Sequence, residues 1–420
     1  MTSSILRRVE WVQVSGKWTK MSIMGTNLSE ENIRLPNKKA DDNRTVILMI
    51  PGNPGNEGFY SHFGKEILGN LMKRDEEMKS EKKEYLFYTV SSLNHVRMPE
   101  NLENRGDHRN CDRISLEEQV KHKLDFVKEH LPRGKEVYIL GHSIGSYMML
   151  RILSSVIHAG FNVCKAIALF PTIQHMAISP NGRRLQTTLA TLNRHDWLTK
   201  TITFWVDYLP LSVKKWLIGF NLSNPRTPIE IVEAATELVY MDVFRNIVHM
   251  SNDELDYVVE LDEILLEKQD IVHFYYGTKD GWCPLEHGHS MRDRLGHEKV
   301  TLDEDNCEHA FVIAEDMANR ANNQRDKERA HARKEKKKAK KEQARRQQQQ
   351  QPPPQQQPPS QTAIKMSQKI MDKVADYRQN DDRFGFVSMH NLIINIKNLG
   401  VEADYWSDQE RNVLALKWFN

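Results

Sequence analysis

The sequence contains few cysteines, and they lie far apart. Only four occur among the 420 residues, Cys111, Cys164, Cys283 and Cys307, and no two of them form a C-x-x-C pair. A disulfide framework and a cysteine-based zinc site both rely on characteristic cysteine spacings, so neither is expected here. The same scarcity is typical of a protein that works in a reducing compartment.

Long apolar runs are also missing. No stretch reaches the roughly 18 uncharged apolar residues that an ordinary membrane-spanning helix needs. The opening residues, MTSSILRRVE, become charged too early to hold the apolar core of a secretory signal. We therefore expect neither a secretory signal nor a spanning helix.

An excess of charge of one sign is confined to a single segment. The chain has 59 Lys/Arg and 57 Asp/Glu, with a formal net charge of +2. Residues 325–346 alone carry +8, which leaves −6 for the rest of the chain. The basic character belongs to this segment, so a core that binds nucleic acid is not supported.

Residues 1–318 alternate short β-rich runs with helical stretches, which predicts an α/β fold with a mostly parallel central sheet and flanking helices. Some runs, such as Val46–Ile50, are apolar throughout, as in strands that are covered on both faces. Apolar spacing between Ile114 and His130 predicts a helix across the sheet. The predicted strands are Glu10–Val14, Thr45–Ile50, Tyr85–Val90, Glu136–Leu140, Ala166–Phe170, Ile271–Tyr276 and Val300–Asp303.

Three further regions differ from this pattern. A long span without strand-like sequence, at about residues 172–265, predicts a helical cap inserted into the domain. Residues 319–361 join a charged stretch to a run of Gln and Pro that cannot pack a core, so we expect a linker that is disordered or a solvated helix. Residues 362–420 regain apolar side chains and predict a small helical segment of unknown role.

The strongest chemical signal is Gly141-His-Ser143-Ile-Gly145, which follows the apolar run Val137–Leu140 and precedes a helical stretch. A strand, G-x-S-x-G and a helix in this order form the context of a nucleophile elbow. The glycines remove side chains where strand and helix approach closely, and the helix N-terminus favours a developing oxyanion. Ser143 is therefore predicted to be a catalytic nucleophile. The alternative is a tight loop with an idle serine.

A serine nucleophile needs a base, and the base needs an orienting acid. In this architecture they follow in the order Ser, then Asp or Glu, then His. Asp280 comes just after the predicted strand Ile271–Tyr276, and His309 follows the last predicted strand, 29 residues beyond Asp280. We predict Asp280 as the acid and His309 as the base; the alternatives are a turn aspartate and a surface histidine. No H-E-x-x-H spacing indicates zinc, and the reaction needs no cofactor.

The stretch Ile50-Pro-Gly-Asn-Pro-Gly55 follows another apolar strand, and its glycines allow close backbone approach. Its second proline lacks an N–H group, so we assign the oxyanion donors to the backbone amides of Asn53 and Ile144. An ordinary Pro-Gly turn is the alternative. Phe59 and Tyr60 are expected to line the mouth of the pocket or simply to pack.

Together these motifs resemble the α/β-hydrolase fold and, more narrowly, the lipid droplet-associated hydrolase family. Their order over about residues 10–315 makes the resemblance specific, although each motif is short. Gly281 departs from the family pattern, where proline is expected, and this loosens the loop that carries Asp280. The segments that carry the resemblance are Ile50-Pro-Gly-Asn-Pro-Gly, Gly141-His-Ser-Ile-Gly-Ser-Tyr, Phe170-Pro-Thr-Ile, Ser179-Pro-Asn-Gly-Arg183, Phe274-Tyr-Tyr-Gly-Thr, Asp280, Trp282-Cys-Pro284 and His309-Ala-Phe.

The resemblance implies a serine esterase or lipase, sterol esterase-like, with Ser143, Asp280 and His309 as its catalytic triad. It implies neutral lipid esters as substrates, either sterol esters or acylglycerols. It also implies a location at the lipid droplet monolayer or the endoplasmic reticulum membrane, on the cytosolic face. The residues after about 320 have no counterpart in the family pattern, and no protein partner is implied.

An aromatic cap segment, Trp197–Phe220, points to a lipid surface without reference to any family. Pro210 and four charged residues make a full span unexpected, but two amphipathic arms around the proline can insert into one leaflet. Tryptophans suit the boundary between polar and apolar layers. The candidate surface residues are Trp197, Phe204, Trp205, Leu209, Trp216 and Phe220. The alternative is that this stretch is only the core of the cap.

Two other functions stay open. One is a structural or tethering protein of lipid droplets with little catalytic turnover, which labelling of Ser143 by a fluorophosphonate probe would distinguish from an esterase. The other is a soluble hydrolase of small esters whose pocket is walled by the aromatic cap. Flotation with lipid droplets would separate this last function from that of a surface enzyme.

We predict that truncation after Asn319 leaves the hydrolase domain folded and active, because its last required residue is His309. Each basic residue held near an anionic surface adds about 1 kcal/mol of attraction at low salt. Binding to anionic liposomes should therefore fall when residues 325–346 are removed, and the lost part should be the salt-sensitive part. Liposome co-sedimentation at low and high salt measures both quantities. Unchanged binding would reduce the tail to a solvated spacer.

Overall fold

The computed structural model describes residues 4–29, 41–78, 83–222, 228–303 and 309–312. The predicted linker and the predicted C-terminal segment, 319–361 and 362–420, lie outside these described residues, and the domain boundary at 318 stays a prediction.

An eight-stranded sheet forms the centre of the described chain, in the order β1-β2-β4-β3-β5-β6-β7-β8. The β1–β2 and β2–β4 pairs are antiparallel and the other pairs are parallel, which confirms the mostly parallel α/β sheet. Each of the seven predicted strands overlaps one of these. The strands are β1 (Leu6–Val14), β2 (Lys17–Gly25), β3 (Asp41–Ile50), β4 (Glu84–Val90), β5 (Gly134–His142), β6 (Val163–Leu169), β7 (Val272–Tyr276) and β8 (Val300–Leu302).

Strand β2 was not predicted from the sequence. Lysines and Ser22 interrupt its apolar residues, so no clear β pattern stands out. The chain enters β2 through a tight hairpin at Ser15 and Gly16, whose φ angles are +46° and +82°. Positive φ at both turn residues is typical of a type I′ hairpin turn. A Ser-Gly pair between two β-rich runs was therefore the signal that could have predicted the strand.

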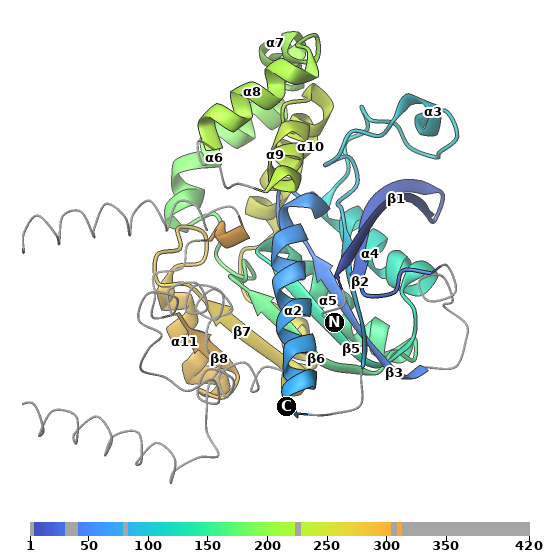
Figure 1. Ribbon diagram of the computed structural model, residues 1–420. Coiled ribbons are helices and arrows are strands. Elements are labelled where there is room, and N and C mark those ends of the chain that lie inside the picture. The colour runs from blue at the N-terminus through green and yellow to red at the C-terminus, as the bar shows by residue number, and fades with distance from the viewer. Residues whose placement is uncertain (1–3, 30–40, 79–82, 223–227, 304–308, 313–420) are drawn as a thin grey trace, which may run out of the picture. The chain divides into compact units, whose positions relative to one another are not determined.

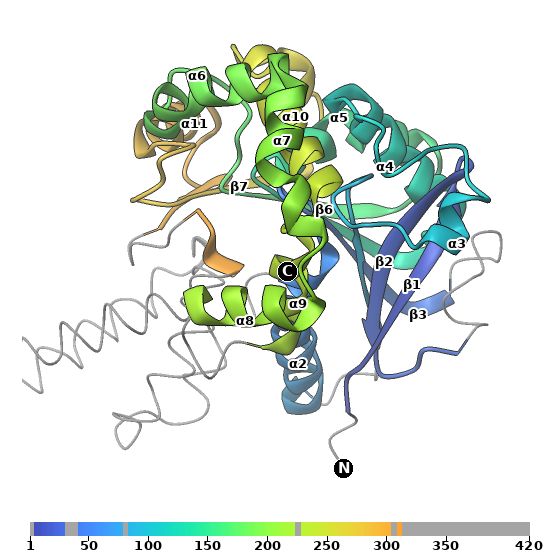
Figure 2. The same cartoon turned by 90° about the horizontal axis from the view of Figure 1, so that it is seen from above.

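Helices cover both faces of the sheet. Figure 2 shows α2 (Ser61–Met78) on one face and α4 (Leu116–His130) and α5 (Ile144–His158) on the other. This two-sided cover explains why Val46–Ile50 of β3 is completely buried. The other elements outside the cap are η1 (Glu57–Tyr60), α3 (Glu100–Glu103), η2 (Glu263–Leu266), η3 (Gln269–Ile271) and α11 (Leu285–Leu295).

Helix α4 confirms the helix predicted between Ile114 and His130. It begins with a capping box, in which the Ser115 side chain accepts from the Glu118 amide and the Glu118 carboxylate accepts from the Ser115 amide. These bonds satisfy backbone donors that have no partner inside the helix. The apolar positions of α4, among them Val120 and Phe126, are buried.

The span between β6 and β7 is helical, as predicted, and forms a cap that contacts the loop after β3. In Figure 1 helix α7 lies at the end of the cap farthest from the sheet. No helix in the described ranges is long and apolar enough to cross a membrane. The cap helices are α6 (Pro180–Arg194), α7 (Asp196–Asp207), α8 (Leu211–Leu222), α9 (Ile229–Glu237) and α10 (Met241–Tyr257).

Candidate active site

Ser143 occupies a sharp turn between β5 and α5. Its backbone has φ +55° and ψ −126°, a conformation that residues other than glycine rarely adopt. A Cβ on Gly141 would lie 2.6 Å from the Gly145 carbonyl oxygen, and a Cβ on Gly145 would lie 2.3 Å from that of Ile50. Both glycines are therefore required by the close approach of strand and helix, as expected for a nucleophile elbow.

The three predicted triad residues meet in a continuous chain of hydrogen bonds. The Ser143 hydroxyl donates to His309 Nε2 at 2.7 Å, and His309 Nδ1 donates to Asp280 Oδ2 at 2.6 Å. The amides of Trp282 and Cys283 donate to Asp280 Oδ1 at 2.7 and 3.1 Å. This arrangement places the Nδ1–H tautomer of His309 next to the carboxylate and leaves Nε2 to accept the serine proton.

Asp280 is held ionised although its side chain is fully buried. Burial raises the pKa of the carboxyl, but the His309 charge and hydrogen bonds from His309 and Cys283 outweigh it and hold the pKa below its ordinary value. The Cys283 thiol donates to Asp280 Oδ2 at 2.9 Å. Burial and, to a smaller extent, the charge of Asp280 raise the pKa of this thiol. Cys283 therefore acts as a neutral donor. This role of Cys283 was not predicted from the sequence.

The loop that carries Asp280 is fastened to the start of α6. The Gly281 carbonyl accepts from the Asn181 amide at 2.8 Å. A Cβ on Gly281 would lie 2.7 Å from the Asn181 side chain. The glycine that departs from the family pattern thus leaves room for Asn181, so the expected loosening of the loop is offset by this contact. Asp303, the acid that directly follows β8, accepts from the Tyr275 hydroxyl at 2.6 Å.

The loop after β3 lies directly against the nucleophile. A Cβ on Gly52 would be 3.0 Å from Ser143 Cβ. Asn53 follows Gly52 in this oxyanion loop, residues 51–55, and Ile144 is the first residue of α5. Within the described ranges, neither the Asn53 amide nor the Ile144 amide donates to a protein acceptor. The assignment of these two amides as oxyanion donors stays a prediction.

A second buried network joins the oxyanion loop to His309. The Gly52 amide donates to the Tyr60 hydroxyl at 3.0 Å, and that hydroxyl lies 2.8 Å from His142 Nδ1. His142 Nε2 lies 2.9 Å from the carbonyl oxygen of His309, so Nε2 donates and Nδ1 accepts from Tyr60. Burial, with a smaller contribution from His309, lowers the pKa of His142 to about 3 and keeps it neutral.

Of the two alternatives expected for Phe59 and Tyr60, lining the mouth of the pocket or simply packing, the structure supports packing. They are only 3% and 2% exposed. Phe59 packs in the core, whereas Tyr60 connects two segments of the site through its hydroxyl.

Potential metal ligands also come together at the triad. In the part of the chain that the structure describes, Asp280, Cys283 and His309 offer ligand atoms within 4.8 Å of one another. The distance from Asp280 Oδ2 to His309 Nδ1 is 2.6 Å and that to Cys283 Sγ is 2.9 Å. Both are shorter than the roughly 3.3–3.5 Å that would separate such ligand atoms around tetrahedral zinc. The cluster therefore fits a proton-transfer site better than a metal site.

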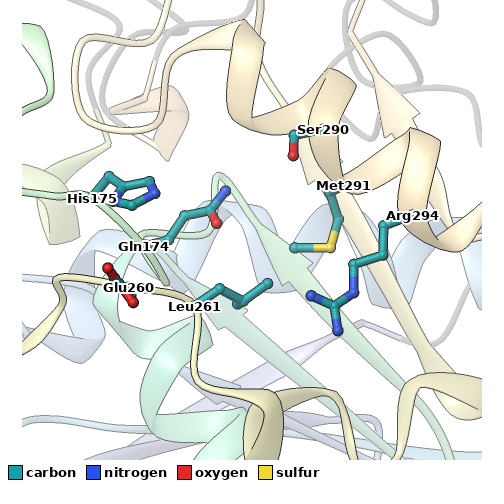
Figure 3. A pocket seen from close by; sticks show the side chains of 7 residues that line it. All are labelled: Gln174, His175, Glu260, Leu261, Ser290, Met291 and Arg294. Atoms are coloured by element: carbon teal, nitrogen blue, oxygen red, sulfur yellow. The ribbon is translucent and has the colours of Figure 1, made fainter.

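A cavity of about 320 Å³ lies apart from the triad, between the loop after β6, the segment before η2 and helix α11. Figure 3 shows Gln174, Leu261, Met291 and Arg294 extending toward a common space. Arg294 pairs with Glu263, so its charge is already balanced. The cavity is lined by Gln174, His175, Glu260, Leu261, Ser290, Met291 and Arg294.

The aromatic cap segment is largely exposed. Trp197 and Trp216 are 65% and 66% exposed, and Phe204 and Trp205 are 52% and 53% exposed. Leu209 is partly buried. The side chain of Phe220, also a candidate, lies outside the described residues. The four aromatic side chains therefore do not form the core of the cap, and whether they meet lipid stays a prediction.

Residues 43–312 match a family model described as lipid-droplet associated hydrolase. The chain is 30% identical to the lipid droplet-associated hydrolase of Pongo abelii over 315 residues and 29% identical to that of Gallus gallus over 304. Both alignments cover 71% of this chain and 85% of the relative.

Two solved structures are similar to the chain at low sequence identity. A serine hydrolase from the bacterium Cycloclasticus zankles is 16% identical, with a TM-score of 0.41, and the match covers 74% of this chain and 95% of that one. The 2-hydroxy-6-oxo-6-phenylhexa-2,4-dienoate hydrolase of Rhodococcus sp. is 14% identical, with a TM-score of 0.42, over 75% and 96%.

We predict that Tyr60→Phe lowers the free energy of unfolding by about 1–3 kcal/mol, because the buried Gly52 amide and His142 Nδ1 both lose their partner. Urea-induced unfolding measures this change. Tyr276→Phe is the matched control, since the Tyr276 hydroxyl is equally buried and has no hydrogen-bond partner among the described residues. Equal losses in the two variants would contradict the network.

Proposed function

The chain belongs to the lipid droplet-associated hydrolase family, and we propose that it is a serine carboxylic-ester hydrolase of neutral lipid esters, either sterol esters or acylglycerols. The proposal places it at the surface of lipid droplets and of the endoplasmic reticulum, on the cytosolic face. One observation carries it: the unbroken hydrogen-bonded chain from the Ser143 hydroxyl through His309 to Asp280.

In the proposed reaction Ser143 Oγ attacks the ester carbonyl carbon while its proton passes to His309 Nε2. Asp280 holds the Nδ1–H of the imidazole and stabilises the imidazolium that forms. The amides of Asn53 and Ile144, with the N-terminus of α5, stabilise the negative oxygen. When the bond to the leaving alcohol breaks, His309 returns the proton to that alcohol, and the acyl group stays on Ser143.

Water completes the cycle. It attacks the acyl carbon as His309 takes one of its protons, the bond to Ser143 Oγ breaks, and the serine regains its proton from His309. One ester and one water thus give one alcohol and one carboxylic acid. No cofactor is expected in either half of the reaction.

The exposed aromatic cap segment supports an apolar substrate over a soluble small ester. Moving a large apolar side chain from water into an apolar layer contributes about 1.5–3 kcal/mol, and four aromatic side chains on α7 and α8 are more than half exposed. Tryptophan prefers the boundary between headgroups and acyl chains. We therefore propose that α7 and α8 lie on the droplet monolayer or the endoplasmic reticulum membrane, close to the source of substrate.

We predict that Ser143→Ala, Asp280→Asn and His309→Ala each lower esterase activity by about 10³-fold or more without unfolding the protein, because triad members act as a unit. A short-chain nitrophenyl ester, an emulsified sterol ester and a triacylglycerol are the substrates. Asp303→Asn is the control, since Asp303 bonds Tyr275 rather than His309. Full activity in Asp280→Asn would mean that the acid is misassigned. If a fluorophosphonate probe does not label Ser143, the tethering function is favoured.

We predict that replacing Trp205, Leu209 and Trp216 by Ser releases the protein from lipid droplets but leaves cleavage of a soluble short-chain ester intact. Flotation and esterase assays of the same preparation measure both effects. A matched control replaces Leu6, Met78 and Ile264, which are 48%, 54% and 58% exposed on elements outside the cap. Unfolding or aggregation of the cap variant would show that these side chains stabilise the cap instead.

A further inference from the structure

The Asn53 side chain reaches from the oxyanion loop to cap helix α10. Its Nδ2 group lies 3.1 Å from the Ile247 carbonyl oxygen, 2.9 Å from Ser251 Oγ and 2.9 Å from Glu254 Oε1. These acceptors are four and three residues apart, so they share one face of the helix. Asn53 Oδ1 is buried without a hydrogen-bond partner among the described residues. The amide nitrogen therefore faces α10.

Two contacts that do not involve Asn53 hold helix α10, one to the body of the protein and one to cap helix α7. Asp253 accepts from the Leu116 amide at the start of α4, at 3.0 Å. Arg245 forms a two-pronged ion pair with Asp196 of α7, at 2.6 and 2.8 Å. The acceptors that face Asn53 thus stand on a helix with defined attachments at both ends.

Glu254 is a buried acid outside the triad, only 2% exposed. Burial raises the pKa of its carboxyl to about 8, the Asn53 hydrogen bond opposes this, and the Asp253 charge adds to it. The carboxyl is therefore mostly neutral at pH 7. A neutral acceptor can hold Asn53 without placing a full negative charge behind the site where an oxyanion develops.

We propose that Glu254 and Ser251 are positioning residues for ester hydrolysis: through the Asn53 side chain they hold the oxyanion loop against Ser143, so that the cap completes the oxyanion site. The inference rests on the proposed function. The position of the oxyanion loop matters because its backbone at Gly52 is packed directly against the Ser143 side chain. An amide displaced by about 1 Å no longer meets the developing charge, and such displacements cost on the order of 10²-fold in rate.

The test compares kcat and KM for a soluble short-chain ester in full-length variants. Glu254→Ala combined with Ser251→Ala should lower kcat about 10–100-fold and change KM by less than about threefold, because an oxyanion donor acts on the transition state. Glu254→Gln should retain kcat, since its amide oxygen still accepts from Asn53. A trifluoromethyl ketone, which forms an oxyanion on Ser143, should bind the double variant more weakly in proportion to the loss of kcat.

The matched control is Asp253→Asn. Asp253 is the neighbouring acid of the same helix, but it bonds the Leu116 amide instead of Asn53. Asp253→Asn should keep the wild-type kcat, whatever its effect on the melting temperature. Equal losses of kcat in Asp253→Asn and in the double variant would mean that α10 supports the fold alone, which overturns the inference.

Hydrogen exchange supplies a readout that does not depend on activity. The Gly52 and Gly55 amides are held by Tyr60 and His95 and report on the oxyanion loop. Exchange in peptides that cover residues 50–56 should rise in the double variant and stay low in Glu254→Gln and Asp253→Asn. Wild-type kcat or unchanged exchange in the double variant overturns the inference. No Ser143-dependent hydrolysis in the wild type, with the expected exchange pattern, overturns the proposed function and supports the positioning contact.

Discussion

The site depends on the lack of space where β5 turns into α5. There is no space for a Cβ at Gly141 or Gly145, and these glycines allow α5 to start directly after β5. Ser143 in this turn has a backbone conformation that lifts its hydroxyl out of the sheet. That position decides what the neighbouring loops can do. The loop after β3 fits against Ser143 only because Gly52 has no side chain, and His309 reaches the hydroxyl from the segment after β8.

Two buried carboxyl groups, Asp280 and Glu254, are held in opposite protonation states by their surroundings. Asp280 receives two amides, a thiol and the imidazole of His309, and these keep it charged despite burial. Glu254 receives a hydrogen bond from a neutral amide, and burial keeps it mostly protonated. In the proposed reaction the charged acid stabilises a positive imidazolium, whereas the neutral acid avoids opposing a negative oxygen. The same functional group thus serves opposite electrostatic needs.

Features that depend on local sequence motifs and on their order along the chain could be predicted from the sequence. The elbow around Ser143, the strand before it and the acid and histidine after later strands all follow from local pattern and chain order. The contacts of Tyr60 and Glu254 could not be predicted, because neither residue stands in a motif. The partners of Tyr60 lie 8 and 82 positions away, and the partner of Glu254 lies 201 positions away. Cys283 did stand in a motif, but only the folded loop shows that its thiol faces Asp280.

The hydrogen-bonded chain at the centre of the site joins segments that are 166 and 29 positions apart. During translation, a chain that has emerged only as far as β7 contains Ser143 but neither Asp280 nor His309. Ser143 is therefore without its base during the synthesis of the 166 positions that separate it from His309. Under the proposed function, cleavage of membrane or droplet esters would start only after the segment that carries His309 has been made and has reached Ser143.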